Sequence, residues 1–137
     1  MARMSTDGLD DVLSELNRLG ERGSQIAAKM AEAGADILEN QLKKTATAKG
    51  HVKTGAMVAS ISKGRPKKIG NGTGYEIYAR GTDSKGVRNA TKAFVLHYGT
   101  SSIKGSHWVD EAEQEGEAAA IQVMEGIFDQ MIQEGGG

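Results

Sequence analysis

The side chains best suited to chemistry in this sequence are three histidines, many serines and a run of carboxylates. His51, His97 and His107 are separated by 46 and 10 residues. These separations lack the short, regular spacings with which metal ligands are usually placed on one helix or turn. We therefore predict no metal site. We interpret His97 as packing beside Tyr98, and His107 as lying near the start of a helix.

Nucleophilic and phosphate-binding patterns are also absent from the sequence. None of the serines lies in a G-x-S-x-G elbow, and the glycine-rich stretch at 70–74 lacks the G-x-x-x-x-G-K-[ST] pattern of a phosphate loop. The carboxylates from Asp110 to Glu117 suit the first turns of a helix, whose dipole favours negative charge. We expect no catalytic residue and no cofactor, and therefore a protein that is not an enzyme.

Charge is strongly segregated along the chain. The net charge of −1 is made of −4 over residues 1–39, +11 over residues 40–104 and −8 over residues 105–137. The stretch from Lys43 to Lys68 has no acidic residue and no aromatic residue. It fits either a solvated loop or a loop that faces an anionic partner, but aromatic stacking on nucleic-acid bases is not expected.

Composition limits the class of protein. The chain has no cysteine, so disulfides and thiolate metal sites are excluded. No apolar run approaches the length of a membrane span, and we expect no membrane partner. The 137 residues suffice for one domain, 1–137, with a modest core of Leu, Ile, Val, Met and Ala.

Apolar periodicity predicts the elements that carry these residues. A helix is expected over about 5–44, with Gly20 and Gly23 marking either a break into two helices or a close backbone contact. A basic loop follows, and residues 54–62 fit a helical turn or the start of a strand. Residues 61–80 predict a β-hairpin that turns at Asn71-Gly72.

The C-terminal half is expected to end in a second long helix. Residues 89–98 fit a short helix with Asn89 as N-cap and Gly99 just beyond its end, but they also alternate as a strand would. A helix is predicted over 106–133, with a flexible tail at 134–137. Two helices packed on a small antiparallel β-meander give an α+β fold.

Three short segments occur in an order that resembles a known family. They are T-G-A-M-V-A-S-I at 54–61, Y-G-T-S at 98–101 and G-S-H-W at 105–108. Over roughly residues 9–133 the chain resembles the tail-completion, or head–tail joining (neck), proteins of long-tailed bacteriophages. It departs from their pattern at Met57, where leucine is usual, at His97, where an acid is usual, and at His107-Trp108, where Pro-Phe is usual.

The resemblance implies a structural virion protein. Such proteins form a ring, commonly a hexamer, that links the connector to the tail tube around the DNA channel. Their partners are copies of themselves, the head-completion or stopper protein, the tail terminator and the tail tube, with possible contact to genomic DNA. The location implied is the virion, after assembly in the host cytoplasm. Two alternatives are kept, namely a tail terminator or other tail ring protein, and a small nucleic-acid-binding protein that uses residues 43–68.

Two sets of residues are expected to meet partners. The first set is assigned to the ring or partner interface, with Gly99 as a permissive turn and Trp108 as the anchor of the second helix. It comprises Tyr98, Gly99, Thr100, Ser101, Lys104, Trp108, Asp110 and Glu111. The second set is assigned to a loop that lines the DNA channel or docks on a partner. It comprises Lys49, Lys53, Lys63, Arg65, Lys67 and Lys68.

Overall fold

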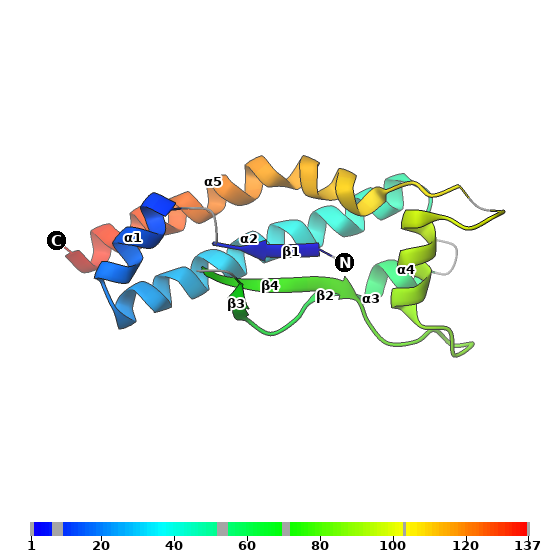
Figure 1. Ribbon diagram of the computed structural model, residues 1–137, viewed down its shortest axis with the longest axis horizontal. Helices are drawn as coiled ribbons and strands as arrows, with labels where there is room; N and C mark the ends of the chain where they lie inside the picture. Colours follow the sequence, from blue (N-terminus) through cyan, green and yellow to red (C-terminus); the bar gives the residue numbers. More distant parts are fainter. Residues whose placement is uncertain (1, 7–9, 52–54, 70–71, 103, 137) are drawn as a thin grey trace.

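The computed structural model describes residues 2–6, 10–51, 55–69, 72–102 and 104–136 of the chain. A four-stranded antiparallel sheet is combined with helices, so the predicted α+β class is confirmed. The elements in chain order are β1 (Ala2–Ser5), α1 (Asp10–Arg18), α2 (Glu21–Ala48), α3 (Ala56–Ser60), β2 (Ile61–Lys63), β3 (Lys67–Ile69), β4 (Gly72–Ala79), α4 (Asn89–Tyr98) and α5 (Trp108–Gly136) (Figure 1).

Strand β4 is the centre of the sheet. β1 pairs along one edge of β4, with Ala2 opposite Ile77. On the other edge β2 pairs with one end of β4 and β3 with the other, with Lys63 opposite Ile77 and Lys67 opposite Gly74. The predicted hairpin is therefore present as β3 and β4. Of its predicted turn residues, Asn71 lies outside the described residues, and Gly72 is the first residue of β4, opposite Ile69. The sheet is not a simple meander, because β2 pairs with β4 and not with β3.

The N-terminal segment differs from its prediction. Residues 2–5 form an edge strand, and the first helix begins only at Asp10. Nothing local in Ala-Arg-Met-Ser favours a strand. The strand forms because it pairs with β4, about 70 residues away in sequence. Gly20 has a φ of 65° and separates α1 from α2.

Gly23 then allows the backbones of these two helices to meet, because a Cβ there would lie 1.8 Å from the carbonyl oxygen of Leu16. Both interpretations of the glycine pair are thus correct.

Helix α2 connects the two parts of the core. It lies against the sheet, and α5 runs alongside it (Figure 1). At one end of the molecule, Leu38 and Leu42 of α2 pack with Ile77 of β4 and Trp108 of α5. At the other end, α1, α2 and α5 share a second apolar cluster that includes Leu16, Ile26, Met30 and Met124. Helix α2 thus contacts both the sheet and the C-terminal helix α5.

Residues 89–98 form a helix, which settles the ambiguity between helix and strand in favour of α4. Arg88 is its N-cap and Asn89 its first residue. The buried side chain of Asn89 donates to the carbonyl oxygen of Arg80 at 2.8 Å, tying the start of α4 to the end of β4. Helix α2 also runs past its predicted end to Ala48, with Thr45 and Ala46 buried.

Candidate partner-binding site

Helix α4 presents an aromatic face to solvent. Phe94 and Tyr98 are 62% and 60% exposed, and they lie one helical turn apart with ring centroids 4.7 Å from each other. Val87, just before the helix, is 44% exposed. Beside the rings is a cavity of about 410 Å³, lined also by Tyr78, Ala90, Ala93, His97, Val109 and Asp110. Large apolar side chains gathered on a surface in this way are typical of contacts with another protein.

Trp108 fixes α4 against the start of α5. The indole is fully buried, and its Nε1 donates to the carbonyl oxygen of Ala93 at 3.3 Å. Its ring meets the ring of His51 edge-on, and Nε2 of His51 lies 2.8 Å from Oγ of Ser106. Trp108 has the anchoring position that we expected, and it presents no surface of its own for a partner.

The segment between α4 and α5 folds back on the end of α4. Gly99 has a φ of 85° and a ψ of −179°, a conformation that is essentially restricted to glycine. The backbone N–H groups of Ser106 and His107 donate to the carbonyl oxygens of Leu96 and His97, each at 3.0 Å. Carbonyls that would have no partner at the end of a helix are thereby satisfied.

Gly105 is essential to this return, and sequence reasoning missed it. A Cβ at Gly105 would lie 2.5 Å from the carbonyl oxygen of His97 and 2.5 Å from the carbonyl carbon of Tyr98. Only glycine lets the two backbones approach so closely. The signal that could have found it is a glycine directly before the Ser-His-Trp start of a helix.

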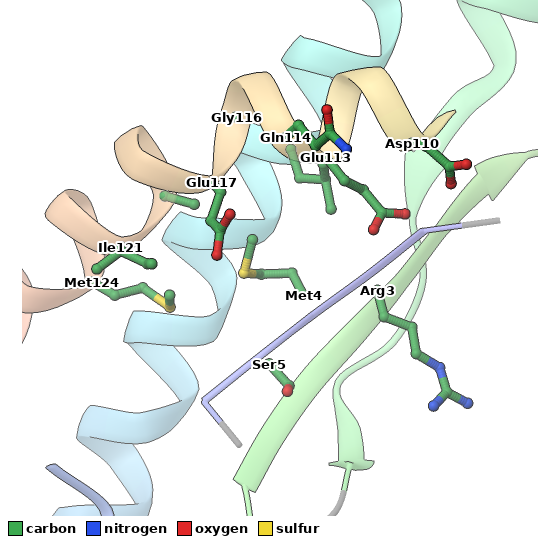
Figure 2. A pocket seen from close by; sticks show the side chains of 12 residues that line it. Arg3, Met4, Ser5, Asp110, Glu113, Gln114, Gly116, Glu117, Ile121 and Met124 are labelled. Atoms are coloured by element: carbon green, nitrogen blue, oxygen red, sulfur yellow. The ribbon is translucent and has the colours of Figure 1, made fainter. Parts of the chain in front are cut away.

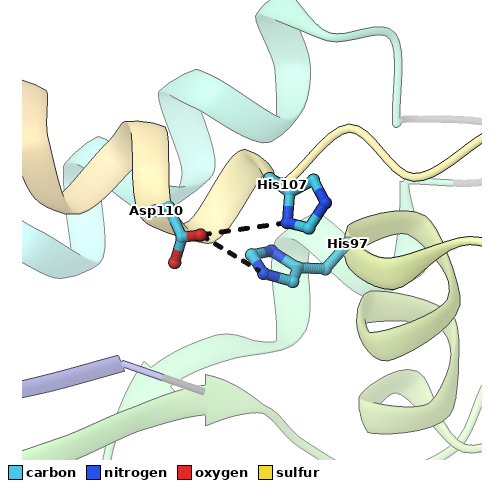
Figure 3. A group of neighbouring side chains, drawn as sticks. All are labelled: His97, His107 and Asp110. Atoms are coloured by element: carbon cyan, nitrogen blue, oxygen red, sulfur yellow. Dashed lines mark ion pairs between the residues drawn. The ribbon is translucent and has the colours of Figure 1, made fainter.

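His97, His107 and Asp110 come together at this junction (Figure 3). One carboxylate oxygen of Asp110 lies 3.8 Å from Nε2 of His97 and 3.9 Å from Nδ1 of His107. The spacing of the histidines in the sequence did not predict this meeting. Burial lowers the pKa of His97, the Asp110 carboxylate opposes that shift, and His107 adds to it.

The hydrogen bonding of His97 argues against metal binding at this cluster. Nδ1 of His97 accepts the backbone N–H of Val109 at 3.2 Å, so Nε2 carries the proton in the neutral ring. Nε2 is the atom that faces Asp110, and a metal there would require both the loss of that proton and a new tautomer. The arrangement of this cluster therefore suits a contact between α4 and α5 better than it suits an ion.

The other residues of the expected interface set lie at the same end of the molecule. Thr100, Ser101 and Lys104 are exposed in the return segment, and Lys104 forms an isolated β-bridge with Gly99. Asp110 is exposed on the first turn of α5. Glu111 pairs with Lys49 at 2.7 Å, which joins one member of the interface set to one member of the basic set.

The basic set is partly neutralised within the chain. Lys63 pairs with Asp36 at 2.6 Å and with Glu32 at 3.4 Å, and Lys67 pairs with Glu76. Arg65 and Lys68 are exposed and form no ion pair with any other described residue. Lys53 lies outside the described residues. Of this set, Arg65 and Lys68, near β2 and β3, are therefore the exposed cations that have no ion pair with another described residue.

A comparison with protein families decides the class of protein. The family model described as "Bacteriophage HK97-gp10, putative tail-component" matches residues 10–95, which is more than half of the chain. The chain belongs to this family of phage tail components. The match runs from the start of α1 into α4. No curated protein and no solved structure matches the chain significantly.

The family confirms the resemblance to phage tail and neck proteins. The matched range stops before Tyr98, so the Y-G-T-S segment, the return at Gly105 and all of α5 lie beyond it. As a phage tail component, this protein is a part of the virion and works among other tail proteins. Within the described part of the chain, none of its helices has both the length and the apolar character needed to cross a membrane.

Proposed function

We propose that this tail component is a structural, non-catalytic subunit of a ring at the head–tail junction. In this tail-completion or neck position it links the connector to the tail tube around the DNA channel. The family supports a place in the tail, and the ordered T-G, Y-G-T-S and G-S-H-W segments support the junction. The observation that carries a subunit contact is the exposed aromatic pair of Phe94 and Tyr98 on α4.

The aromatic pair supports assembly because its exposure has a cost that a partner would remove. Transfer of apolar surface from water is worth roughly 25 cal/mol per Å², and aromatic side chains dominate the energy of many protein interfaces. The pair lies on a helix that Trp108 and the return segment hold firmly, so little entropy is lost when it docks. A ring of six such subunits, the copy number implied by the resemblance, would close through heterologous contacts.

Two alternatives use the same surfaces differently. A tail terminator or another tail ring protein would also need an exposed contact face, and only the motif resemblance favours the junction over these positions. A nucleic-acid-binding protein is supported less well. Lys49, Lys63 and Lys67 are paired with acids of their own chain, which leaves fewer cations for phosphates.

The aromatic pair provides a direct test. We expect native mass spectrometry of the purified protein to show a ring. We expect the double variant Phe94→Ser with Tyr98→Ser to weaken subunit association by at least about tenfold, as loss of an interface anchor does. Gln25→Ala, an exposed change near the start of α2 and outside the aromatic face of α4, is the control and should assemble normally. Circular dichroism should show all variants folded.

Two results would contradict the proposal. One is a protein that stays monomeric at all concentrations and binds no neck or tail protein. The other is a monomer whose affinity for short duplex DNA falls steeply with salt, which would favour the nucleic-acid-binding alternative. Normal assembly of the double variant would remove α4 from the interface.

A further inference from the structure

A second surface with a well-defined chemical character lies between β1 and α5. It is a groove of about 630 Å³ (Figure 2). Apolar side chains from β1, α2 and α5 line it, together with carboxylates of α5. The apolar members are Met4, Leu38, Ala120, Ile121 and Met124, and the carboxylates are Asp110, Glu113 and Glu117.

Carboxylates outnumber cationic side chains in the described lining of this groove. Arg3 also lines the groove, but its guanidinium pairs with Glu76 at 3.3 Å and points away from α5 (Figure 2). No ion pair among the described residues involves Glu113 or Glu117. Although the side chain of Glu113 is exposed, partial desolvation raises its pKa, the nearby Asp110 carboxylate raises it further, and the positive charge of the chain's amino terminus opposes these shifts. A cation brought near these two carboxylates would relieve their repulsion.

The loop of residues 82–88 has the complementary character. It lies at the end of the molecule opposite the C-terminus (Figure 1). Val87 is exposed there, and the exposed cations Lys85 and Arg88 flank it. Neither of these two cations forms an ion pair with another residue that the structure describes. The loop thus offers one apolar side chain between two positive charges, which matches an apolar groove with acidic carboxylates.

Asp83 holds this loop in a fixed shape. Its Oδ1 accepts the backbone N–H groups of Lys85 at 2.8 Å and Val87 at 2.9 Å, and its Oδ2 pairs with Lys92 at 2.5 Å. These bonds, led by the one to Lys92, lower the pKa of Asp83 to about 2, so it is ionised at neutral pH. A loop ordered before binding loses little entropy when it docks.

We propose that the 82–88 loop of one copy docks in the β1–α5 groove of a second copy. Val87 would contact the apolar lining, while Lys85 and Arg88 would face the carboxylates of Glu113 and Glu117. The loop and the groove are different surfaces, so every copy offers one of each, and such heterologous contacts close a ring. This inference rests on the proposed ring and names a pair of surfaces that would join neighbouring copies beside α4.

Disulfide cross-linking tests this pairing cleanly, because the chain has no cysteine. The variant with Val87→Cys and Ile121→Cys should form covalent multimers under mild oxidation. The control has Val87→Cys with Ala119→Cys, an exposed position on α5 that does not line the groove. It should remain largely monomeric on a denaturing gel. Equal cross-linking of both variants, or none of the first, would overturn the proposal.

Charge reversal supplies an independent test by native mass spectrometry. Lys85→Glu with Arg88→Glu should weaken assembly at least about tenfold, and Glu113→Lys with Glu117→Lys should do the same. Combining all four substitutions should restore assembly, since opposite charges face each other again. Failure of the combined variant to recover, with its circular dichroism unchanged, would count against direct contact.

The outcomes separate this inference from the proposed ring. If the unmodified protein forms a ring while the cross-link and charge reversals have no effect, the loop–groove pairing is wrong and the ring stands. If the unmodified protein never associates with itself, the ring fails and the pairing fails with it. If the groove cross-links only to another tail protein in assembled particles, a second copy is not its occupant.

Discussion

His97 connects α4 to α5 through both its side chain and its backbone. Its Nδ1 accepts the N–H of Val109, one of the donors in the first turn of α5 that have no partner within the helix. Its carbonyl oxygen accepts the N–H of His107. The ring is only 7% exposed, and burial favours its neutral form. One residue thus completes the end of one helix and the beginning of the next.

The pKa of His97 predicts a pH dependence of stability. The unfolded histidine has a pKa of about 6.5, and the folded value is lower, mainly because of burial. The contribution of neutral His97 to the stability of the folded protein is therefore present above the unfolded pKa. It is lost as the pH falls toward the folded pKa. We expect the free energy of unfolding in urea to fall between about pH 7.5 and about pH 5, the range in which histidine titrates.

The variant His97→Asn isolates this effect, because its amide oxygen can accept the Val109 N–H without titrating. The fall in stability should be smaller in this variant than in the unmodified protein. His51 also has a pKa lowered by burial and by Lys49, so His51→Asn serves as the second comparison. Identical pH dependence in the unmodified protein and in His97→Asn would show that His97 makes no such contribution.

The junction of α4 and α5 shows what sequence patterns can predict at the scale of an element. Apolar periodicity predicted both long helices because each buries a continuous face, and Gly99 was rightly expected at the end of the short element. The strand β1 was missed because its pairing with β4 is set by distant residues. Residues 89–98 were ambiguous because alternation and helical spacing coincide over ten residues.

Gly105 and Gly126 should respond to alanine with opposite signs. In Gly105→Ala the new methyl would collide with the backbone at the end of α4, so we expect destabilisation of about 1–3 kcal/mol, as in overpacked cores. Gly126 lies within α5 with nothing within 4 Å of an added Cβ. There we expect a gain of about 0.5–1 kcal/mol from helix propensity. Urea unfolding measures both, and a stabilised Gly105→Ala would contradict the close approach.

At the scale of the whole molecule, charge along the sequence is redistributed by folding. The basic and acidic segments are separate along the sequence, but Lys49 pairs with Glu111 and Lys63 pairs with Asp36 inside one chain. The cations left outward include Arg65 and Lys68 and, in the 82–88 loop, Lys85 and Arg88. Sequence alone could predict an uneven charge distribution, but not which charges cancel, because that depends on α2 lying against β2.

The aromatic face of α4 and the acidic groove between β1 and α5 are distinct surfaces of the described chain. A tail component with two different contact surfaces can meet neighbours on both sides, which suits a subunit of a ring. The family match at 10–95 places the chain in the phage tail but covers neither Tyr98 nor the acidic residues of α5. The proposed ring would therefore use surfaces that only the folded structure brings together.

Cryo-microscopy of phage particles that contain this protein is the most direct test of the proposed ring. We expect a closed ring of this chain at the junction of head and tail, with α4 at the contact between subunits and the central channel open for DNA. A density that places the protein elsewhere in the virion, or as isolated copies without mutual contact, would contradict the proposed function.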